Sequence, residues 1–479
     1  MNKTLTKPGY ADLDGIFHPE SVAVVGASEG LVQMGLLRPF VTCGFPGKIY
    51  PVNHNGGEVL GLKVYKSIKD IPGRLDYVVF VTPASTISSL LEECAAKGVK
   101  AASFFTAGFG ESGCDEGKAL QEKIVEIARR EGVRLIGPNC LGIYCPAGRI
   151  SYIPDPPLKT GPVGFISQSG GNAVYIIRAG DPRGLGFSKV VSYGNGVDID
   201  ESELLEYMAG DDETEIIGLY IEGVKNGRRF LDTLKKAASR KPVIILKGGC
   251  TDTGKRAALS HTGSIAGSKE VWDSTVRESG AMTVNTMEDM VDYLVTFTYM
   301  PKLHGNRVGI AGWGGGASVQ AADICEGEGF SVPPFPEELQ RQMAGYWLRA
   351  GSILGNPVDT VSWTGNPDNF RNIIKCAANW DGIDILMLQI GVIGGLMGMA
   401  TMLEFLPKVV DSYIDVIKAV RKPAAIVLHS NATAAGWEAF YVQAAKCREA
   451  GIPVYHSLQG AARALNAYYR YCSLKNPKI

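Results

Sequence analysis

The feature that most constrains the fold of this 479-residue chain is a regular alternation of short β-branched runs with helical segments. Five such runs, each followed by small residues, lie at 21–28, 48–53, 77–84, 101–110 and 134–142. Between them we predict helices at 86–98 and 116–132, the second closed by Gly132 as a C-cap. Strands and helices that alternate in this way form a parallel sheet with right-handed crossovers. The sequence therefore predicts an α/β protein whose ligand-binding loops follow the strands.

A proline-rich joint and a weak internal repeat divide the rest of the chain. The segment IPDPPLKTGP at 153–162 breaks both helix and strand. Beyond it, four pairs of similar segments follow one another in the same order: 163–174 with 308–319, 194–198 with 355–359, 216–224 with 385–392, and 240–248 with 421–429. Duplication explains this order better than the strand–glycine–helix texture that all α/β domains share. Because the length also exceeds one hydrophobic core, we expect domains near 1–150, 160–300 and 301–479.

Two residues of the first copy have no equivalent in the second. Glu222 aligns with Ile390, and the segment 430–440 of the second copy offers no counterpart to His261. A fold that both copies share does not need these two side chains. They therefore indicate function.

Composition excludes several classes of protein. Lys+Arg 48 against Asp+Glu 49 gives a formal net charge of -1, which is no footprint for nucleic acid or an anionic membrane. The ten cysteines form no CxxC pair, so we predict no metal site and expect reduced thiols in the cytoplasm. The N-terminal segment has no apolar region typical of a secretion signal. Residues 385–403 imitate a membrane span, but we interpret them as a buried strand, a Gly-rich loop and a helix.

Two loops have the composition of phosphate-binding turns. GASEG at 26–30 follows a strand, although it is not the G-x-G-x-x-G dinucleotide fingerprint. In SQSGG at 167–171, Ser167 or Ser169 can cap the helix that follows, and the same groups could hold a phosphate or a phosphorylated side chain. From the residues alone, a tight turn and a simple cap explain the two loops equally well.

His261 lies in ALSHTGSIAG at 258–267, a segment of small residues that we expect to be a mobile loop. Imidazole is nucleophilic near neutral pH, so such a histidine could accept a phosphoryl group at one site and deliver it at another. Glu222 follows the apolar run 216–221 and could orient one imidazole nitrogen. The alternatives are that His261 is a loop histidine with no catalytic role and that Glu222 is a surface glutamate at a strand end.

Taken together, these segments resemble the α subunit of ADP-forming acetyl-CoA synthetase and, more distantly, that of succinyl-CoA synthetase. The resemblance covers essentially the whole chain. Its motifs are GAS at 26–28, TPA at 82–84, TAGFGE at 106–111, GPNCLG at 137–142, SQSG at 167–170, YIEG at 220–223 and LSHTGSIAG at 259–267. It implies a Rossmann-like CoA-binding domain followed by two flavodoxin-like domains.

The resemblance also implies a role for each motif. The CoA-binding residues would be Gly26, Ala27, Ser28, Asn53, Thr82, Pro83, Thr106, Gly108 and Asn139. Phosphate would be held by Ser167, Ser169, Gly170 and Gly171. His261 would be the phosphorylated residue, and Glu222 would orient it.

The reaction implied by the resemblance is reversible: acyl-CoA, phosphate and ADP give the acid, CoA and ATP through an acyl phosphate and a phosphohistidine. The chain has no Walker A motif, G-x-x-x-x-G-K-[ST]. The resemblance therefore implies that ADP and Mg²⁺ bind a separate ATP-grasp β subunit in an α2β2 heterotetramer.

Two other readings compete with this one. A non-catalytic CoA- or acyl-CoA-sensing protein on the same fold would be expected to lack His261 or Glu222, and both are present. An NAD-dependent oxidoreductase would need G-x-G-x-x-G and an acidic residue after the second strand, where this chain has PVNHNGG at 51–57. The acyl group and the choice between ADP and GDP cannot be read from motifs.

Overall fold

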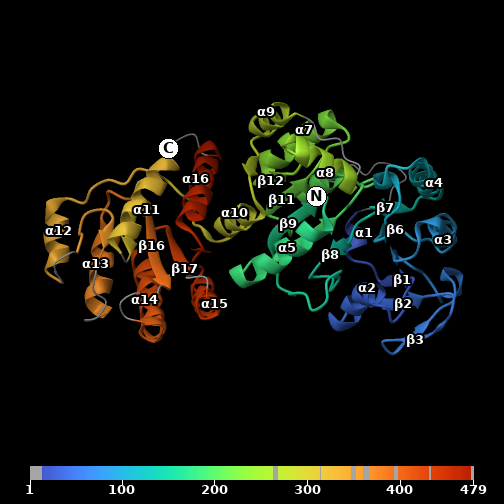
Figure 1. The fold of residues 1–479 in the computed structure, drawn as a ribbon, viewed down its shortest axis with the longest axis horizontal. Helices are drawn as coiled ribbons and strands as arrows, with labels where there is room; N and C mark the ends of the chain where they lie inside the picture. The colour runs from blue at the N-terminus through green and yellow to red at the C-terminus, as the bar shows by residue number, and fades with distance from the viewer. Residues whose placement is uncertain are drawn as a thin grey trace. The chain divides into compact units, whose positions relative to one another are not determined.

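The computed structural model describes residues 13–262, 268–312, 314–346, 352–359, 367–392, 398–430 and 433–475. The chain forms two compact units, shown with their elements in Figure 1. The first comprises Met1–Asp181 and Gly186–Met290, and the second comprises Pro182–Leu185 and Val291–Ile479. The division into domains near 1–150, 160–300 and 301–479 stays a prediction.

The first sheet of the first unit has five parallel strands in the order β2-β1-β5-β6-β7. They are β1 (Ser21–Val25), β2 (Lys48–Val52), β5 (Tyr77–Phe80), β6 (Ala101–Phe104) and β7 (Arg134–Ile136). Helix α1 (Asp14–Phe17) precedes β1, and the connections contain α2 (Leu31–Thr42), the hairpin β3 (Gly57–Val59) and β4 (Leu62–Val64), α3 (Ile87–Ala96) and α4 (Asp115–Glu131), with short 3-10 turns at Ile68–Asp70, Ala84–Thr86 and Gly110–Ser112. All five predicted strand runs are confirmed.

Local chemistry sets the ends of the predicted helices. Helix α4 begins where the Cys114 sulfur accepts the Gly117 N–H, and it ends at Gly132 in the left-handed conformation, with φ 74°. Its buried face includes Ile124 and Ile127, which pack into the apolar core beside the sheet. The two predicted helices and the glycine C-cap are confirmed within a residue or two.

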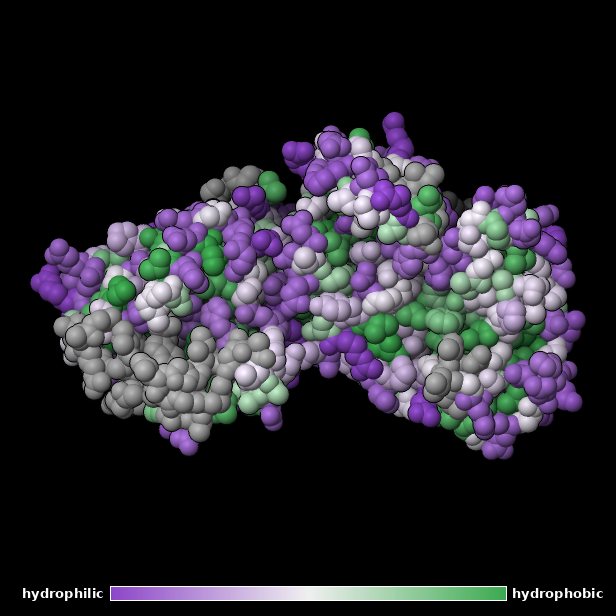
Figure 2. All heavy atoms as spheres, viewed as in Figure 1, coloured by the Kyte–Doolittle hydropathy of each residue, from purple (hydrophilic) through white to green (hydrophobic). Residues whose placement is uncertain are grey.

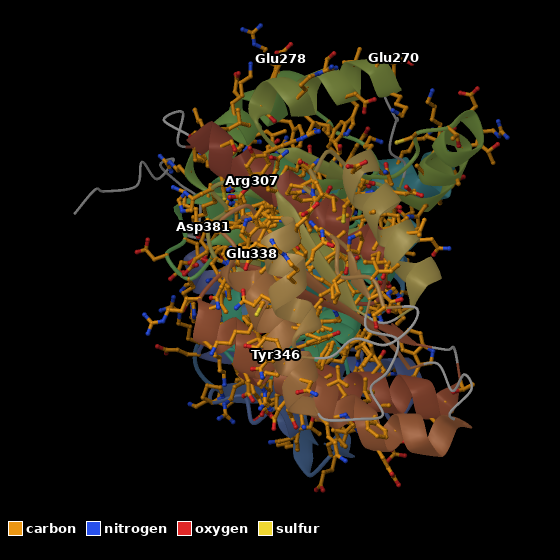
Figure 3. All side chains as sticks on the ribbon, turned by 90° about the vertical axis from the view of Figure 1, so that its left-hand side faces the viewer. Glu270, Glu278, Arg307, Glu338, Tyr346 and Asp381 are labelled. Atoms are coloured by element: carbon orange, nitrogen blue, oxygen red, sulfur yellow. The ribbon has the colours of Figure 1, made fainter. Side chains whose placement is uncertain are left out.

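The second sheet of the first unit has the order β13-β12-β11-β9-β10-β8 and is parallel except for β8. Its strands are β8 (Gly142–Tyr144), β9 (Thr160–Ser167), β10 (Phe187–Ser192), β11 (Ile216–Ile221), β12 (Val243–Lys247) and β13 (Met282–Val284). The helices of this region are α5 (Gly170–Gly180), α6 (Glu201–Gly210), α7 (Gly227–Arg240), α8 (Asp252–Thr262) and α9 (Lys269–Ser279). The short 3-10 turn Asp181–Arg183 and helix α10 (Met287–Tyr299) each begin in the first unit and end in the second. Figure 3 shows Glu270 and Glu278 on α9, away from the sheet.

The second unit holds a parallel sheet in the order β15-β14-β16-β17-β18. Its strands are β14 (Val308–Gly312), β15 (Val358–Asp359), β16 (Ile385–Val392), β17 (Ala424–Ser430) and β18 (Val454–Tyr455). Its helices are α11 (Gly315–Gly327), α12 (Glu337–Ala344), α13 (Pro367–Asn379), α14 (Gly398–Val420), α15 (Ala434–Glu449) and α16 (Leu458–Lys475). Arg307, labelled in Figure 3, clamps the starts of β14 and β16 with two bonds to Asp384 at 2.9 and 2.7 Å.

The predicted duplication appears in the strand order. Without β8, the second sheet reads β10-β9-β11-β12-β13, and the third reads β15-β14-β16-β17-β18. In both, the order by position in the copy is second, first, third, fourth, fifth. This doubly wound arrangement is the flavodoxin-like one, with a switch point between the first and third strands.

The pairing register corrects one detail of the repeat. Ile216 pairs with Val163 in the first copy, and Ile385 pairs with Val308 in the second. Counting along the strands from these pairs places Gly391, and not Ile390, at the position of Glu222. The alignment by sequence similarity was wrong here because it matched Gly223 with Gly391 and ignored the pairing of the strands. The conclusion that the second copy lacks this carboxylate is unchanged.

The apolar segment 385–403 contains β16 and the start of α14, as interpreted from the sequence, and its loop 393–397 lies outside the described residues. No helix in the described part of the chain is long and apolar enough to cross a membrane. On the face drawn in Figure 2, hydrophilic residues are spread over both units.

Candidate active site

The loop after β1 is packed tightly between its two neighbouring strands. Gly26 has φ 96°, and a Cβ there would lie 2.5 Å from the Val81 carbonyl oxygen, so a side chain cannot be accommodated. The N–H groups of Gly26 and Ala27 donate to the Val52 carbonyl at 2.8 and 3.1 Å. The Asn53 amide donates to the Ala27 carbonyl at 3.0 Å. The fold thus brings the loop after β1 and the loop after β2 together at one edge of the sheet.

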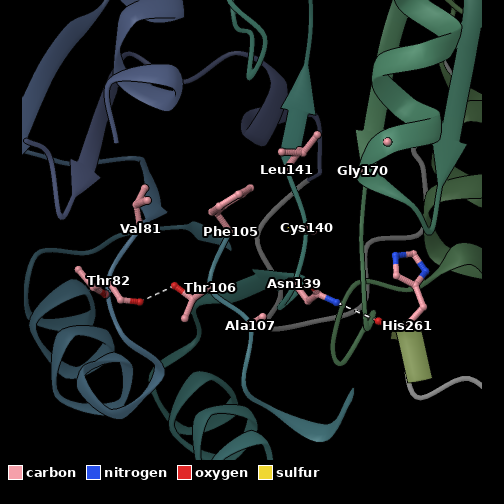
Figure 4. A pocket seen from close by; sticks show the side chains of 11 residues that line it. Val81, Thr82, Phe105, Thr106, Ala107, Asn139, Cys140, Leu141, Gly170 and His261 are labelled. Carbon is pink, nitrogen blue, oxygen red and sulfur yellow. Dashed lines mark hydrogen bonds between the residues drawn. The ribbon is translucent and has the colours of Figure 1, made fainter. Parts of the chain in front are cut away.

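The loops after β5 and β6 continue this edge. The Thr106 hydroxyl donates to the Thr82 carbonyl at 2.6 Å, a contact drawn in Figure 4. The Thr82 hydroxyl oxygen is itself buried and has no hydrogen-bond partner within the described ranges. Gly108, with φ 103°, donates its N–H to Glu111 at 2.7 Å. A buried hydroxyl without a partner is costly, so Thr82 suits a bound ligand.

A cavity of about 550 Å³ opens where the first sheet meets the start of α5. It is lined by residues 81–82 and 105–107, by 139–141, by 170–171 and by His261, most of them labelled in Figure 4. Five of these residues carry apolar side chains or a thiol: Val81, Phe105, Ala107, Cys140 and Leu141. Cavities of this size that combine apolar walls with a few polar groups are typical of small-molecule sites.

His261 and Glu222 meet directly. The Nδ1 atom of His261 lies 2.9 and 3.1 Å from the two carboxylate oxygens of Glu222. The Glu222 side chain is 5% exposed, whereas that of His261 is 50% exposed. The hydrogen bond to Glu222 raises the pKa of His261 above its usual value, against the lowering effect of partial burial. A carboxylate only accepts, so Nδ1 carries the proton and Nε2 is left with the free lone pair.

The local setting of His261 differs from the prediction in one respect. The residue lies in the last turn of helix α8, whereas the sequence suggested a loop over 258–267. Lys255, Arg256 and Ala257 are good helix formers and extend the helix into that segment. Residues 263–267 lie outside the described part of the chain. The Asn139 amide donates to the His261 carbonyl at 3.1 Å (Figure 4) and so ties α8 to the loop after β7.

Three residues to which no role was predicted hold Glu222 in place. The Gln168 side-chain oxygen accepts the N–H groups of Glu222 and Gly223 at 2.7 and 3.2 Å. The Tyr220 hydroxyl donates to Glu222 Oε1 at 3.1 Å. The Lys247 ammonium donates to the Glu222 carbonyl at 2.6 Å, and burial lowers its pKa. Their positions at the ends of β9, β11 and β12 were the available signal, because β9 and β11 flank the switch point and β12 lies next to β11.

The SQSGG turn shows how a cap builds the start of α5. Ser169 is the N-cap, and its hydroxyl accepts the Asn172 N–H at 3.4 Å. The Ser167 hydroxyl is fully buried and donates to the Ser169 carbonyl at 2.6 Å. Gly170 and Gly171 begin the helix and line the cavity beside His261. The free N–H groups of a helix start favour an anion there.

The structure therefore brings six of the predicted residues to one cavity: Thr82, Thr106, Asn139, Gly170, Gly171 and His261. Glu222 stands behind His261, and Ser167 and Ser169 shape the turn below it. Gly26, Ala27, Ser28, Asn53, Pro83 and Gly108 do not line the cavity. The Ser28 hydroxyl accepts the Gly30 N–H at 3.3 Å, and the Pro83 carbonyl accepts the Thr86 hydroxyl at 2.8 Å. The ligand roles of all these residues stay predictions.

Comparison with known families agrees with this arrangement. Residues 20–146 match the family described as CoA binding domain, and residues 160–297 match the succinyl-CoA ligase like flavodoxin domain. Fold and site thus define a CoA ligase built on doubly wound sheets, and the predicted fold class is confirmed.

Individual relatives narrow the class. The chain is 39% identical over 392 residues, 81% of its length and 84% of the relative's, to acetate–CoA ligase (ADP-forming) II subunit α of Pyrococcus furiosus. It is 35% identical over 475 residues, 97% and 98% of the two chains, to the ligase I subunit α of the same organism. Among solved structures, dinucleotide-forming acetyl-coenzyme A synthetase 1 of Ca. Korarchaeum cryptofilum, in complex with phosphate and ADP, matches with TM-score 0.81, 30% identity and coverage of 98% and 99%. This chain belongs to the family of ADP-forming acetate–CoA ligase α subunits.

Proposed function

We propose that this chain is the catalytic α subunit of an NDP-forming acyl-CoA synthetase. It reversibly converts acyl-CoA, phosphate and ADP to the acid, CoA and ATP through an acyl phosphate and a phosphohistidine. The observation that carries the proposal is the pair formed by His261 Nδ1 and Glu222 at 2.9 Å, placed on a cavity that also receives the start of α5. A CoA-sensing protein without catalysis would have no use for a histidine oriented in this way.

The first step joins phosphate to the acyl group. CoA lies along the carboxyl edge of the first sheet, with its thioester in the 550 Å³ cavity. A phosphate oxygen attacks the thioester carbon, the C–S bond breaks, and CoA leaves as a thiolate that takes up a proton. The helix start at Gly170 and Gly171 stabilises the phosphate charge through its N–H groups.

The second step moves the phosphoryl group to the protein. Nε2 of His261 attacks the phosphorus, the bond to the acyl oxygen breaks, and the acid leaves as a carboxylate. Glu222 accepts the Nδ1–H bond, which keeps the imidazole in the tautomer with a lone pair on Nε2 and stabilises the positive charge that develops on the ring. The phosphoryl group then passes to ADP.

We propose that ADP and Mg²⁺ bind a separate ATP-grasp β subunit and that two chains of each kind form an α2β2 heterotetramer in the cytoplasm. The relatives from Pyrococcus furiosus are named as α subunits, which implies a partner for them. No group of three or more His, Cys, Asp or Glu residues suited to a metal ion occurs in the described part of this chain. We further propose the domain boundaries near 1–150, 160–300 and 301–479.

The test is direct labelling of the full chain, alone and with the partner subunit supplied. Radioactive phosphate and a panel of acyl-CoAs are expected to place acid-labile, base-stable phosphate on His261, located by mass spectrometry. His261→Ala abolishes the label. The proposal fails if no acyl-CoA supports labelling, or if His261→Ala labels as well as the wild type.

A further inference from the structure

The Tyr220 hydroxyl lies between the Glu222 carboxylate and the first turn of helix α5. It donates to Glu222 Oε1 at 3.1 Å, and the Asn172 side chain lies near the same hydroxyl. Asn172 is the third residue of α5, and its backbone N–H donates to the capping Ser169. Tyr220 therefore lies near both the carboxylate that contacts His261 and the helix start that lines the cavity.

The space for this hydroxyl depends on a glycine in the neighbouring strand end. A Cβ on Gly248 would lie 2.7 Å from the Tyr220 hydroxyl oxygen and 3.2 Å from Glu222 Cγ. Both distances are shorter than an ordinary van der Waals contact. Gly248 thus leaves room for both side chains at the point where they meet.

The duplicated sheet shows that the fold does not require Tyr220. Counting from the aligned strand pairs, the second copy has Gln389 in place of Tyr220 and Gly391 in place of Glu222. The two side chains are replaced together, while the strand and its neighbours are retained. Structure alone therefore does not account for a tyrosine at this position.

The geometry indicates what the hydroxyl does. Glu222 Oε1 receives both the His261 Nδ1–H bond at 2.9 Å and the Tyr220 bond at 3.1 Å. The terminal torsion of a glutamate is broad, so each donor to its carboxylate restricts the rotation further. A second donor on the same oxygen fixes the carboxylate plane and withdraws part of its negative charge.

We propose that Tyr220 is a positioning residue for phosphoryl transfer, which holds Glu222 against His261 Nδ1 so that Nε2 faces the phosphoryl group bound at the start of α5. The inference rests on the proposed function of His261. Tyr220 forms no covalent bond in the reaction. It acts through Glu222, beside the Asn172 side chain.

The test compares Tyr220→Phe with the wild type in the full chain together with its partner subunit. The rate of His261 phosphorylation from acyl-CoA and phosphate is followed by rapid quench across the pH range in which His261 titrates. Losing one hydrogen bond to a charged group slows the plateau rate by about tenfold. Because Glu222 then concentrates its charge on His261, the acidic limb of the pH profile moves to higher pH.

Tyr175→Phe is the matched control, since Tyr175 also donates to a glutamate, Glu288 at 2.7 Å, on the surface of the same unit. It leaves both the rate and the pH profile unchanged. If Tyr220→Phe does not fold, as judged by its melting curve, Asn172→Ala keeps the ring and moves the acidic limb in the same direction by less.

The inference is overturned if wild type labels His261 and the acidic limb stays in place or moves to lower pH in the variant. A slower rate with an unmoved limb counts against it as well, because a merely structural role would produce that result. If His261 is not labelled in the wild-type protein, the proposed function itself is refuted, so the two failures are distinguishable.

Discussion

Replacing Glu222 with glutamine removes the charge beside His261 and keeps the shape of the side chain. The hydrogen bond between Nδ1 and Glu222 is 2.9 Å long and charge-assisted, a class of interaction that contributes about 1.5–3 kcal/mol. The His261 side chain is 50% exposed, so water screens the pair and the lower end applies. About 1.5 kcal/mol corresponds to roughly a tenfold slower phosphorylation of His261.

The pH dependence gives the sign of the effect. A protonated imidazole has no lone pair on Nε2, so the rate rises as the pH passes upward through the pKa of His261. Glu222 raises that pKa through its hydrogen bond, and the glutamine variant returns it toward its usual range. The acidic limb therefore moves to lower pH in Glu222→Gln, and the full loss of rate is seen only on the alkaline plateau.

The assay is rapid-quench labelling of His261 with radioactive phosphate from about pH 5.5 to about pH 8.5, the range in which histidines titrate. Glu288→Gln, which changes a carboxylate on the surface of the same unit, is the matched control and behaves as the wild type. Equal plateau rates in Glu222→Gln and wild type would refute the reasoning. An acidic limb that does not move, or that moves to higher pH, would refute it too.

Three further predictions concern other parts of the first unit. Asn139→Gly removes the bond to the His261 carbonyl without straining a residue at φ 57°, so labelling slows roughly fivefold for about 1 kcal/mol lost, measured by the same rapid quench. Gly26→Ala places a Cβ 2.5 Å from the Val81 carbonyl, so it weakens CoA binding in isothermal titration and lowers the melting temperature. Lys189→Met leaves two carboxylates without their buried partner at 2.8 and 2.6 Å, which costs about 3 kcal/mol in urea unfolding of this unit.

Each of these predictions has an outcome that contradicts it. An Asn139→Asp variant that labels as fast as wild type would show that the amide donor is not needed, since a carboxylate cannot donate to the His261 carbonyl. Unchanged CoA affinity in Gly26→Ala would separate the tight turn from ligand binding. For Lys189→Met, the control is Lys269→Met, which removes an ion pair with Asp273 on the surface and is expected to leave the unfolding transition unchanged. Equal unfolding transitions for the two variants would contradict the argument.

Much of the fold could be predicted because its signals are local. The β-branched runs, the apolar spacing of 116–132 and the C-cap at Gly132 depend on neighbours in the sequence, and the strands and helices formed there. The repeat could also be detected from the sequence, as pairs of similar segments in the same order. The hairpin Gly57–Val59 and Leu62–Val64 was not predicted, because its two strands are only three residues long.

The site was predictable only in part. His261 and Glu222 could be selected because the second copy lacks them, but their contact joins residues 39 positions apart. Gln168 and Tyr220 lie inside the SQSG and YIEG motifs but received no predicted role, and Lys247 lies in none of these motifs. Tyr220 precedes Glu222 by two residues and so lies on the same face of the chain. Gln168 and Lys247 contact Glu222 because the parallel strands β9, β11 and β12 end side by side, and no local pattern records which strand ends are neighbours.

The sequence by itself determined the class of fold, the duplication and the residue types available for chemistry, since backbone propensity and apolar periodicity act over a few residues. Tertiary structure alone decided the strand register, which makes Gly391 of the second copy equivalent to Glu222 of the first. It also placed His261 in the last turn of α8. It also brought the Glu222 carboxylate to 2.9 Å from His261 Nδ1. These depend on strand pairing and side-chain packing between distant segments, which only the folded chain brings within hydrogen-bond distance.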